Sequence, residues 1–223
     1  MRKMPTGPAP PQGRQTRIHV KIQGSMELRT QLLSRMARCT AEHQVPGMFL
    51  ASVLSSAGTR GAEVAAQARQ QLRESGSLVE SYRYPVSWML GMLDVIGQCA
   101  EQQGESYGEA LYRVGQEAGE AYVQSTVGKV RAMVAAASGL HRTLEGIPGA
   151  ASQAVNFGEH SYRRLSVSSG ELAFRQDLIG VSWNTGMVVA STCAALSLKV
   201  ETLKVAVHQT DPDASSFLLR LEW

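Results

Sequence analysis

Apolar and polar positions divide this sequence into a helical part and a part rich in β-structure. Between about residues 25 and 150, apolar side chains recur at intervals of three or four, which is the spacing of one face of an α-helix. The period then changes to two, which is typical of half-buried strands. The alternating segments are residues 162–167, 171–175, 203–207 and 217–223.

Proline and glycine mark the expected ends of the helices. Pro46 and Pro85 each suit the first turn of a helix, and Gly146, Pro148 and Gly149 are expected to end the helical part. The predicted helices are residues 25–38, a segment that begins at Pro46, and residues 61–73, 85–102, 107–126, 127–137, 141–147 and 184–196.

Other glycines indicate where helices pack closely or break. Gly115 and Gly119 are four residues apart, so they lie on one face of their helix. Each costs about 1 kcal/mol of helix propensity relative to alanine, which a close contact with a neighbouring backbone must offset. Ser138 and Gly139 are expected to separate two short helices.

These patterns together predict an α+β fold. The last third reads β-β-α-β-β after mainly helical sequence, so we expect an N-terminal helical layer packed on one face of a C-terminal antiparallel sheet. Residues 17–23 alternate as well and predict a possible extra strand near the N-terminus. Residues 1–16 hold four prolines and several basic residues, which predicts a disordered tail. Residues 17–223 are then expected to form a single domain.

Composition narrows the class of protein. The chain has 223 residues, is 43% hydrophobic and carries a net charge of +3, which argues against wholesale disorder. No apolar run reaches the length of about 20 residues that a membrane helix needs, and no secretory signal follows the first residues. An odd number of widely spaced cysteines (Cys39, Cys99 and Cys193) indicates reduced thiols and a cytoplasmic protein.

Motifs for catalysis, metal binding and nucleic-acid binding are absent from the sequence. Gly128-Lys129 resembles the end of a phosphate loop, but Val130 stands where serine or threonine is required. Cys39 and His43 are four residues apart and could supply two ligands to a metal ion, but the sequence offers no second pair of ligands. His141 can be imagined as an axial haem ligand, but a capping or solvent-facing role is the simpler interpretation. We therefore expect no enzyme, catalytic residue, metal or cofactor, and no nucleic-acid partner.

Methionine and aromatic residues of the predicted helical layer are the candidates for a binding site. Methionine adapts to varied apolar surfaces, so a cluster of such residues suits an apolar pocket or a face for a partner helix. The ordinary alternative is that they fill the core. The candidate ligand-binding residues are Trp88, Met89, Met92, Tyr122, Met133, Trp183 and Met187.

Several short segments, in order along the chain, resemble a myxobacterial paralogous family of uncharacterised proteins of about 180 residues. These segments are Val45-Pro46-Gly47-Met48-Phe49, Tyr84-Pro85-Val86, the stretch from Glu109 to Gly115, Asn156-Phe157 and the closing Leu219-Arg220-Leu221-Glu222-Trp223. Residues 1–24 fall outside the resemblance. The family is distantly similar to a superfamily of ligand-binding domains for nitric-oxide signalling and Golgi transport. That superfamily includes nitric-oxide-sensing haem domains, vinyl-reductase-like sensor domains and TRAPP-like vesicle-tethering subunits.

The resemblance implies binding rather than catalysis, because members of the wider superfamily bind small hydrophobic ligands or dimerise through helices. The haem branch uses a Tyr-x-Ser-x-Arg motif that this chain lacks. We therefore expect a non-catalytic bacterial signalling domain, a sensor or adaptor that binds an apolar small molecule or a partner protein, with a homodimer expected. The alternative is a structural interaction module that dimerises and needs no ligand.

Overall fold

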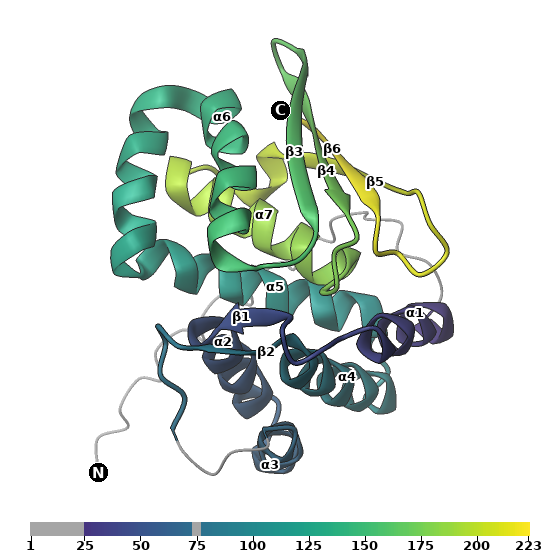
Figure 1. Ribbon diagram of the computed structural model, residues 1–223. Helices are drawn as coiled ribbons and strands as arrows, with labels where there is room; N and C mark the ends of the chain where they lie inside the picture. Colours follow the sequence, from purple (N-terminus) through teal and green to yellow (C-terminus); the bar gives the residue numbers. More distant parts are fainter. Residues whose placement is uncertain (1–24, 73–76) are drawn as a thin grey trace, which may run out of the picture.

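The structure, a computed structural model, describes residues 25–72 and 77–223 (Figure 1). The predicted tail over residues 1–16 and the predicted strand over residues 17–23 lie outside the described residues. The elements are α1 (Ser25–Ala37), β1 (Gln44–Pro46), α2 (Gly47–Thr59), α3 (Ala62–Gln70), β2 (Arg83–Pro85), α4 (Val86–Gln102), α5 (Tyr107–Gln124), α6 (Thr126–Ala154), β3 (Glu159–Ser166), β4 (Ser169–Arg175), α7 (Val181–Leu196), a 3-10 turn (Val200–Thr202), β5 (Lys204–Gln209) and β6 (Phe217–Glu222).

The C-terminal strands form one antiparallel sheet in the order β3-β4-β6-β5. β3 and β4 are a hairpin that turns at Val167 and Ser168, and β6 pairs with both β4 and β5. Since α7 lies between the second and third of these strands in sequence, the predicted β-β-α-β-β order is confirmed. A small sheet was not expected: β1 and β2 pair antiparallel, each directly before a helix.

Helices cover one face of the C-terminal sheet, as the alternation of apolar residues predicted. In Figure 1, α6 and α7 lie along one side of the strands, and α1 to α5 form the lower part of the molecule. The Phe174 and Phe217 rings stack on the covered face with centroids 4.6 Å apart. The fully or nearly buried side chains of β4 and β6 are Leu172, Phe174, Phe217, Leu219 and Leu221.

α5 and α7 pack with their backbones in direct contact, which confirms the expectation from the glycine spacing. A Cβ atom at Gly115 would overlap the carbonyl oxygen of Trp183, and one at Gly119 would lie 2.7 Å from that of Met187. The contact is reciprocal, because a Cβ atom at Gly186 on α7 would overlap the carbonyl oxygen of Tyr112 on α5. Any larger residue at these positions would push the two helices apart.

A buried arginine ties α1 to the loop before α7. Arg35 is 4% exposed and donates to the backbone carbonyls of Leu178, Ile179 and Asp213. Burial lowers the pKa of the Arg35 guanidinium, and the negative charge of Asp177 partly offsets that effect. The polar contacts thus fix the first described helix to the C-terminal part of the chain.

α6 consists of two helical arms that meet at a sharp bend. Gly139 has φ 77° and ψ 179°, a conformation that glycine adopts at little cost, and it separates residues 126–138 from residues 140–154. The break predicted at Ser138 and Gly139 is therefore confirmed. The predicted end near Pro148 is wrong, because the helix continues to Ala154, where Arg83 donates to the carbonyls of Gln153 and Ala154 and caps it.

Within the described residues, no helix is both long enough and apolar enough to cross a membrane.

Candidate functional site

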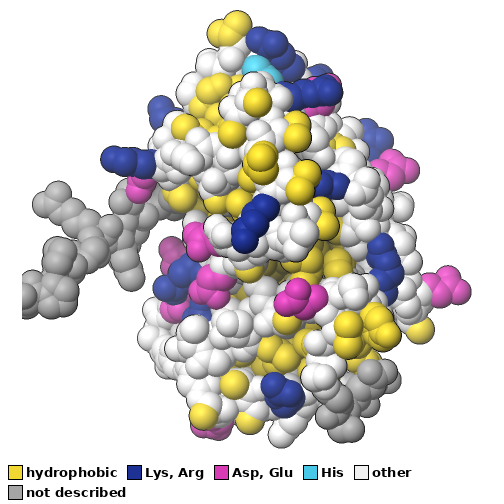
Figure 2. Space-filling view, turned by 90° about the vertical axis from the view of Figure 1, so that its left-hand side faces the viewer, with side chains coloured by type: hydrophobic (Ala, Val, Ile, Leu, Met, Phe, Trp, Pro, Cys, Tyr) yellow, Lys and Arg dark blue, Asp and Glu magenta, His cyan; other side chains and the backbone are white. Residues whose placement is uncertain are grey.

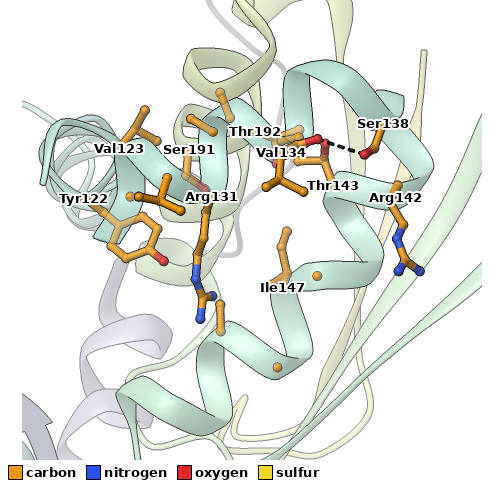
Figure 3. A pocket seen from close by; sticks show the side chains of 18 of the residues that line it. Tyr122, Val123, Arg131, Val134, Ser138, Arg142, Thr143, Ile147, Ser191 and Thr192 are labelled. Atoms are coloured by element: carbon orange, nitrogen blue, oxygen red, sulfur yellow. Dashed lines mark hydrogen bonds between the residues drawn. The ribbon is translucent and has the colours of Figure 1, made fainter. Parts of the chain in front are cut away.

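The two arms of α6 flank a cavity of about 500 Å³ that is open to solvent (Figure 3). The end of α5 and the second half of α7 also line it, and its volume lies within the range of about 300–1,000 Å³ of small-molecule sites. The lining is mostly small and apolar with a few polar side chains. It comprises Tyr122, Val123, Gly128, Val130, Arg131, Ala132, Val134, Ala135, Ser138, Arg142, Thr143, Glu145, Gly146, Ile147, Gly149, Ala150, Gln153, Ser191, Thr192 and Ala195.

A tight connection between α5 and α6 sets the position of the first arm. The Ser125 hydroxyl donates to the Tyr122 carbonyl at 2.6 Å and accepts from the Gly128 N–H at 3.1 Å, so one side chain ends α5 and caps α6. Gly128 leaves no room for a Cβ atom beside the Tyr122 carbonyl oxygen. The chain therefore reverses closely enough for both helices to line the same cavity.

The second arm is anchored to the sheet and to the C-terminus. Leu144 is fully buried, and α6 packs against β3. One ring nitrogen of His141 lies 2.5 Å from the Tyr162 hydroxyl, and the other lies 3.2 Å from the Val167 carbonyl. The Trp223 ring meets the His141 ring edge-on at 4.7 Å. The second arm is thus a fixed wall of the cavity.

The first arm, by contrast, exposes several large apolar side chains to solvent. Met133 is 75% exposed and lies outside the cavity lining. Val130 and Val134 line the cavity and are nevertheless 61% and 62% exposed. Figure 2 looks at the side of the molecule that α6 occupies in Figure 1, and it shows hydrophobic side chains gathered among scattered lysines and arginines. This arm is held less tightly by packing than the second arm.

Most polar groups of the lining already have partners in the structure. The Ser138 hydroxyl donates to the Val134 carbonyl and the Thr143 hydroxyl to the Gly139 carbonyl, as Figure 3 shows for Ser138. Arg142 forms an ion pair with Glu145 at 2.7 Å. These groups are satisfied and do not need a ligand.

Thr192 is the buried polar residue of the lining whose hydroxyl lacks a partner among the described residues. It is 1% exposed, and its hydroxyl has no hydrogen-bond partner among the residues that the structure describes. A buried polar group without a partner costs roughly 1–3 kcal/mol, so such a group is expected where a ligand or water completes the contact. The Thr192 hydroxyl is thus an unsatisfied polar group that lies buried just beneath the surface of the cavity.

The candidate residues proposed from the sequence do not converge on this cavity. Tyr122 lines it, whereas Met133 lies on the same helix as much of the lining but points to solvent. Five others belong to the core or pack against it: Trp88, Met89, Met92, Trp183 and Met187. Trp183 meets Phe49 edge-on at 5.4 Å, and Trp88 lies against Tyr84.

Apart from Tyr122, the residues that line the cavity were not identified from the sequence. Alanine, glycine, serine and threonine on a helix are common on every kind of surface, so their pattern does not indicate a pocket. The one usable signal was the break at Gly139, because a short reversal between two helices brings their facing sides together.

Two buried ionisable groups outside the cavity, Asp177 and Cys193, have contacts that indicate a structural role. Asp177 accepts from the N–H groups of Ile179 and Gly180 and from the Asn184 amide, and it lies 3.5 Å from His160 in the core. Burial raises the pKa of the Cys193 thiol to about 11, which keeps it protonated and unreactive at neutral pH. No group of three or more histidine, cysteine or acidic residues in the described chain could hold a metal ion.

The fold is similar to that of H-NOX domains. The Fe(II) unliganded H-NOX protein from K. algicida shares 10% identity, with a TM-score of 0.59 over 79% of this chain and 95% of that chain. An oxygen-binding H-NOX domain related to soluble guanylate cyclases gives 9% identity and a TM-score of 0.55 over 79% and 94%. A third structure is described as "Modulating Heme Redox Potential Through Protein-Induced Porphyrin Distortion". It shares 9% identity, with a TM-score of 0.55 over 80% of this chain and 99% of that chain. At these identities the likeness shows the fold alone.

The residues of this chain do not fit a haem in the cavity. Haem iron in proteins is held mainly by histidine, cysteine, methionine or tyrosine. Among the described residues, the cavity lining contains only Tyr122 of these types. His141 has both ring nitrogens in contacts with Tyr162 and Val167, so neither is free for iron.

A family described as "Protein of unknown function (DUF2378)" matches residues 38–223. No curated protein matches the sequence.

Proposed function

The chain belongs to this family, for which no function is known, and we propose a function from the structure. We propose that the chain is a non-enzymatic sensor domain that binds a small apolar molecule between the two arms of α6. The observation that carries the proposal is the cavity itself, of about 500 Å³ and with a mostly apolar lining. The H-NOX-like fold supports a sensing role by analogy, since one of the domains that it resembles is described as oxygen-binding.

The arrangement of α6 suits a ligand-driven change of conformation. The second arm is anchored through Leu144 and His141, whereas the first arm is largely exposed and joins the second at Gly139. A ligand that prefers one angle between the arms would shift their populations, and the exposed side of the first arm would carry that change to a partner. We extend the proposal to a single domain over residues 17–223 that acts in the cytoplasm.

Native mass spectrometry of the protein from its own cells tests this function. We expect a fraction of the protein to carry an added small-molecule mass. Ile147 points into the space between the arms (Figure 3), so Ile147→Trp should fill the cavity and abolish the added mass. Val127→Trp places the same ring on an exposed position of α6 outside the lining and should retain it. Equal retention by both variants would contradict the proposal.

A second candidate function is dimerisation without a ligand. It is favoured by the exposed apolar row Val127, Val130, Met133 and Val134 on the first arm of α6, which a second copy of this chain would cover. Met133 lies outside the cavity lining, so Met133→Glu separates the two candidates. Under this function it should convert a dimer to a monomer in analytical ultracentrifugation, and a wild-type protein that is already monomeric would exclude it.

A further inference from the structure

One cation at the cavity has no acidic partner in the part of the chain that the structure describes. Arg131 lies on the first arm of α6 and lines the cavity, and its Nη2 lies 2.5 Å from the Gln153 side-chain oxygen on the second arm. Gln153 is neutral, and within residues 25–72 and 77–223 no carboxylate forms an ion pair with Arg131. The other arginine of the lining, Arg142, is paired with Glu145.

A second guanidinium adds positive charge at the same end of the cavity. Arg83 donates to the backbone carbonyls of Gln153 and Ala154, so both arginines converge on the end of the second arm. Among the described residues, Arg83 also has no carboxylate partner within ion-pair distance. This end of the cavity therefore favours a negatively charged group.

The rest of the lining is suited to a hydrocarbon chain. Val123, Val134, Ala135 and Ile147 form apolar walls beside Arg131. The planar guanidinium matches a carboxylate, with which it forms two parallel charge-assisted hydrogen bonds. Arg83 caps the end of the helix and does not line the cavity, so one guanidinium reaches the ligand, which suits a singly charged carboxylate better than a phosphate group with a charge nearer about −2.

We propose that the α6 cavity binds an aliphatic carboxylate, with its head group at Arg131 and its chain on the apolar walls; this rests on the proposed ligand-binding function. The ligand would replace the Gln153 contact of Arg131 and so release the one side-chain hydrogen bond that the described residues form between the arms. Arg131 would therefore couple ligand binding to the movement of the first arm relative to the second.

Displacement of an uncharged fluorescent probe tests the proposal. Nile red is bound to the full-length protein and then displaced by decanoate or by decanol, which share a chain but differ in charge. We expect Arg131→Gln to weaken decanoate at least about tenfold and to leave decanol unchanged, because only decanoate loses its two charge-assisted hydrogen bonds to Arg131. Arg131→Lys should keep part of the decanoate affinity, because the charge remains without the fork geometry.

Lys129→Gln is the matched control, because Lys129 also carries a positive charge on the first arm of α6 but is exposed and outside the cavity lining. It should leave both affinities unchanged. If Arg131→Gln changes decanoate and decanol alike, the carboxylate assignment is overturned while the ligand-binding function stands. If Nile red binds equally to the wild type and to Ile147→Trp, the binding function itself fails. Thermal melts of each variant show whether it is folded.

Discussion

Two buried tyrosines show how the partner of a single hydroxyl decides its contribution to stability. The Tyr107 hydroxyl donates to Asp94 at 3.0 Å, and Asp94 also accepts from Arg29 and Gln98. The Tyr112 hydroxyl is buried without a partner among the described residues. Each hydroxyl gave up water on folding, but only that of Tyr107 received a hydrogen bond from the described chain in return.

Removing the two hydroxyls should therefore have opposite effects. Tyr107→Phe should destabilise the protein by about 1.5–3 kcal/mol, the value of a hydrogen bond to a charged group. Tyr112→Phe should leave the free energy of unfolding unchanged or raise it by about 1 kcal/mol, because it removes an unsatisfied polar atom. Urea denaturation of both variants measures the difference, and equal losses would show that Tyr112 has a partner.

Tyr112 should also make the stability of the protein depend on pH under alkaline conditions. Burial raises the pKa of Tyr112 from 10.0 to about 12, so the folded chain holds this proton more tightly than the unfolded chain does. The stability contribution is fully present below pH 10 and is lost as the pH rises towards 12. Tyr112→Phe should reduce the loss of stability in this window, as measured by urea denaturation at several pH values.

Arg35 is the residue whose loss should cost most outside the apolar core. Arg35→Met removes the donor for the carbonyls of Leu178, Ile179 and Asp213 and leaves Asp177 without its neighbouring cation. Because a buried group left without its hydrogen-bond partner costs about 1–3 kcal/mol, we expect Arg35→Met to lower the free energy of unfolding by at least about 3 kcal/mol. Arg38→Met is the control, because its ion pair with Asp213 is at the surface and is worth about 0–1 kcal/mol. Similar midpoints in urea for both variants would argue against the buried contacts.

At the scale of elements, the contact between α5 and α7 depends on glycines and was foreseen in part. The spacing of Gly115 and Gly119 predicted a close neighbour, because two helical glycines need packing to offset their cost. The sequence did not identify α7 as that neighbour. Gly186 carried no signal on its own, since a single glycine in a helix has many explanations.

Gly115→Ala tests this contact directly. The new Cβ atom would overlap the Trp183 carbonyl, so we expect a loss of about 1–3 kcal/mol even though alanine is the better helix former. At Gly58 on α2 a Cβ atom would meet nothing within 4 Å among the described residues, so Gly58→Ala should gain up to about 1 kcal/mol. Thermal unfolding should move in opposite directions, and a gain in both variants would contradict the packing.

The elements also show why the cavity could not be predicted from the sequence. The alternating strands were recognised because each buries every second side chain in a sheet of fixed geometry. Met89 and Met92 look equally suited to a core and to a pocket, and the choice depends on which helix packs over them. Arg131 and Thr192 become neighbours of one cavity only after α6 has folded back at Gly139.

At the scale of the whole molecule, an H-NOX-like fold is combined with a lining that does not suit haem. The fold is shared over most of the chain, but the described residues around the α6 cavity include no histidine or cysteine. The protein should therefore bind added haemin without the sharp absorbance band of axial histidine ligation, and His141→Ala should not change the spectrum. A histidine-type spectrum that disappears in His141→Ala would show that the His141 contacts open to admit iron.

Methyl NMR on protein labelled at isoleucine, valine and methionine locates the ligand most directly. On titration with Nile red, the methyl signals of Ile147, Val123 and Val134 should shift in a saturable manner, whereas those of Met89, Met92 and Val127 should stay in place. Shifts confined to Met89 and Met92 would place the binding site in the helical core, and the absence of saturable shifts would contradict a ligand-binding role for the α6 cavity.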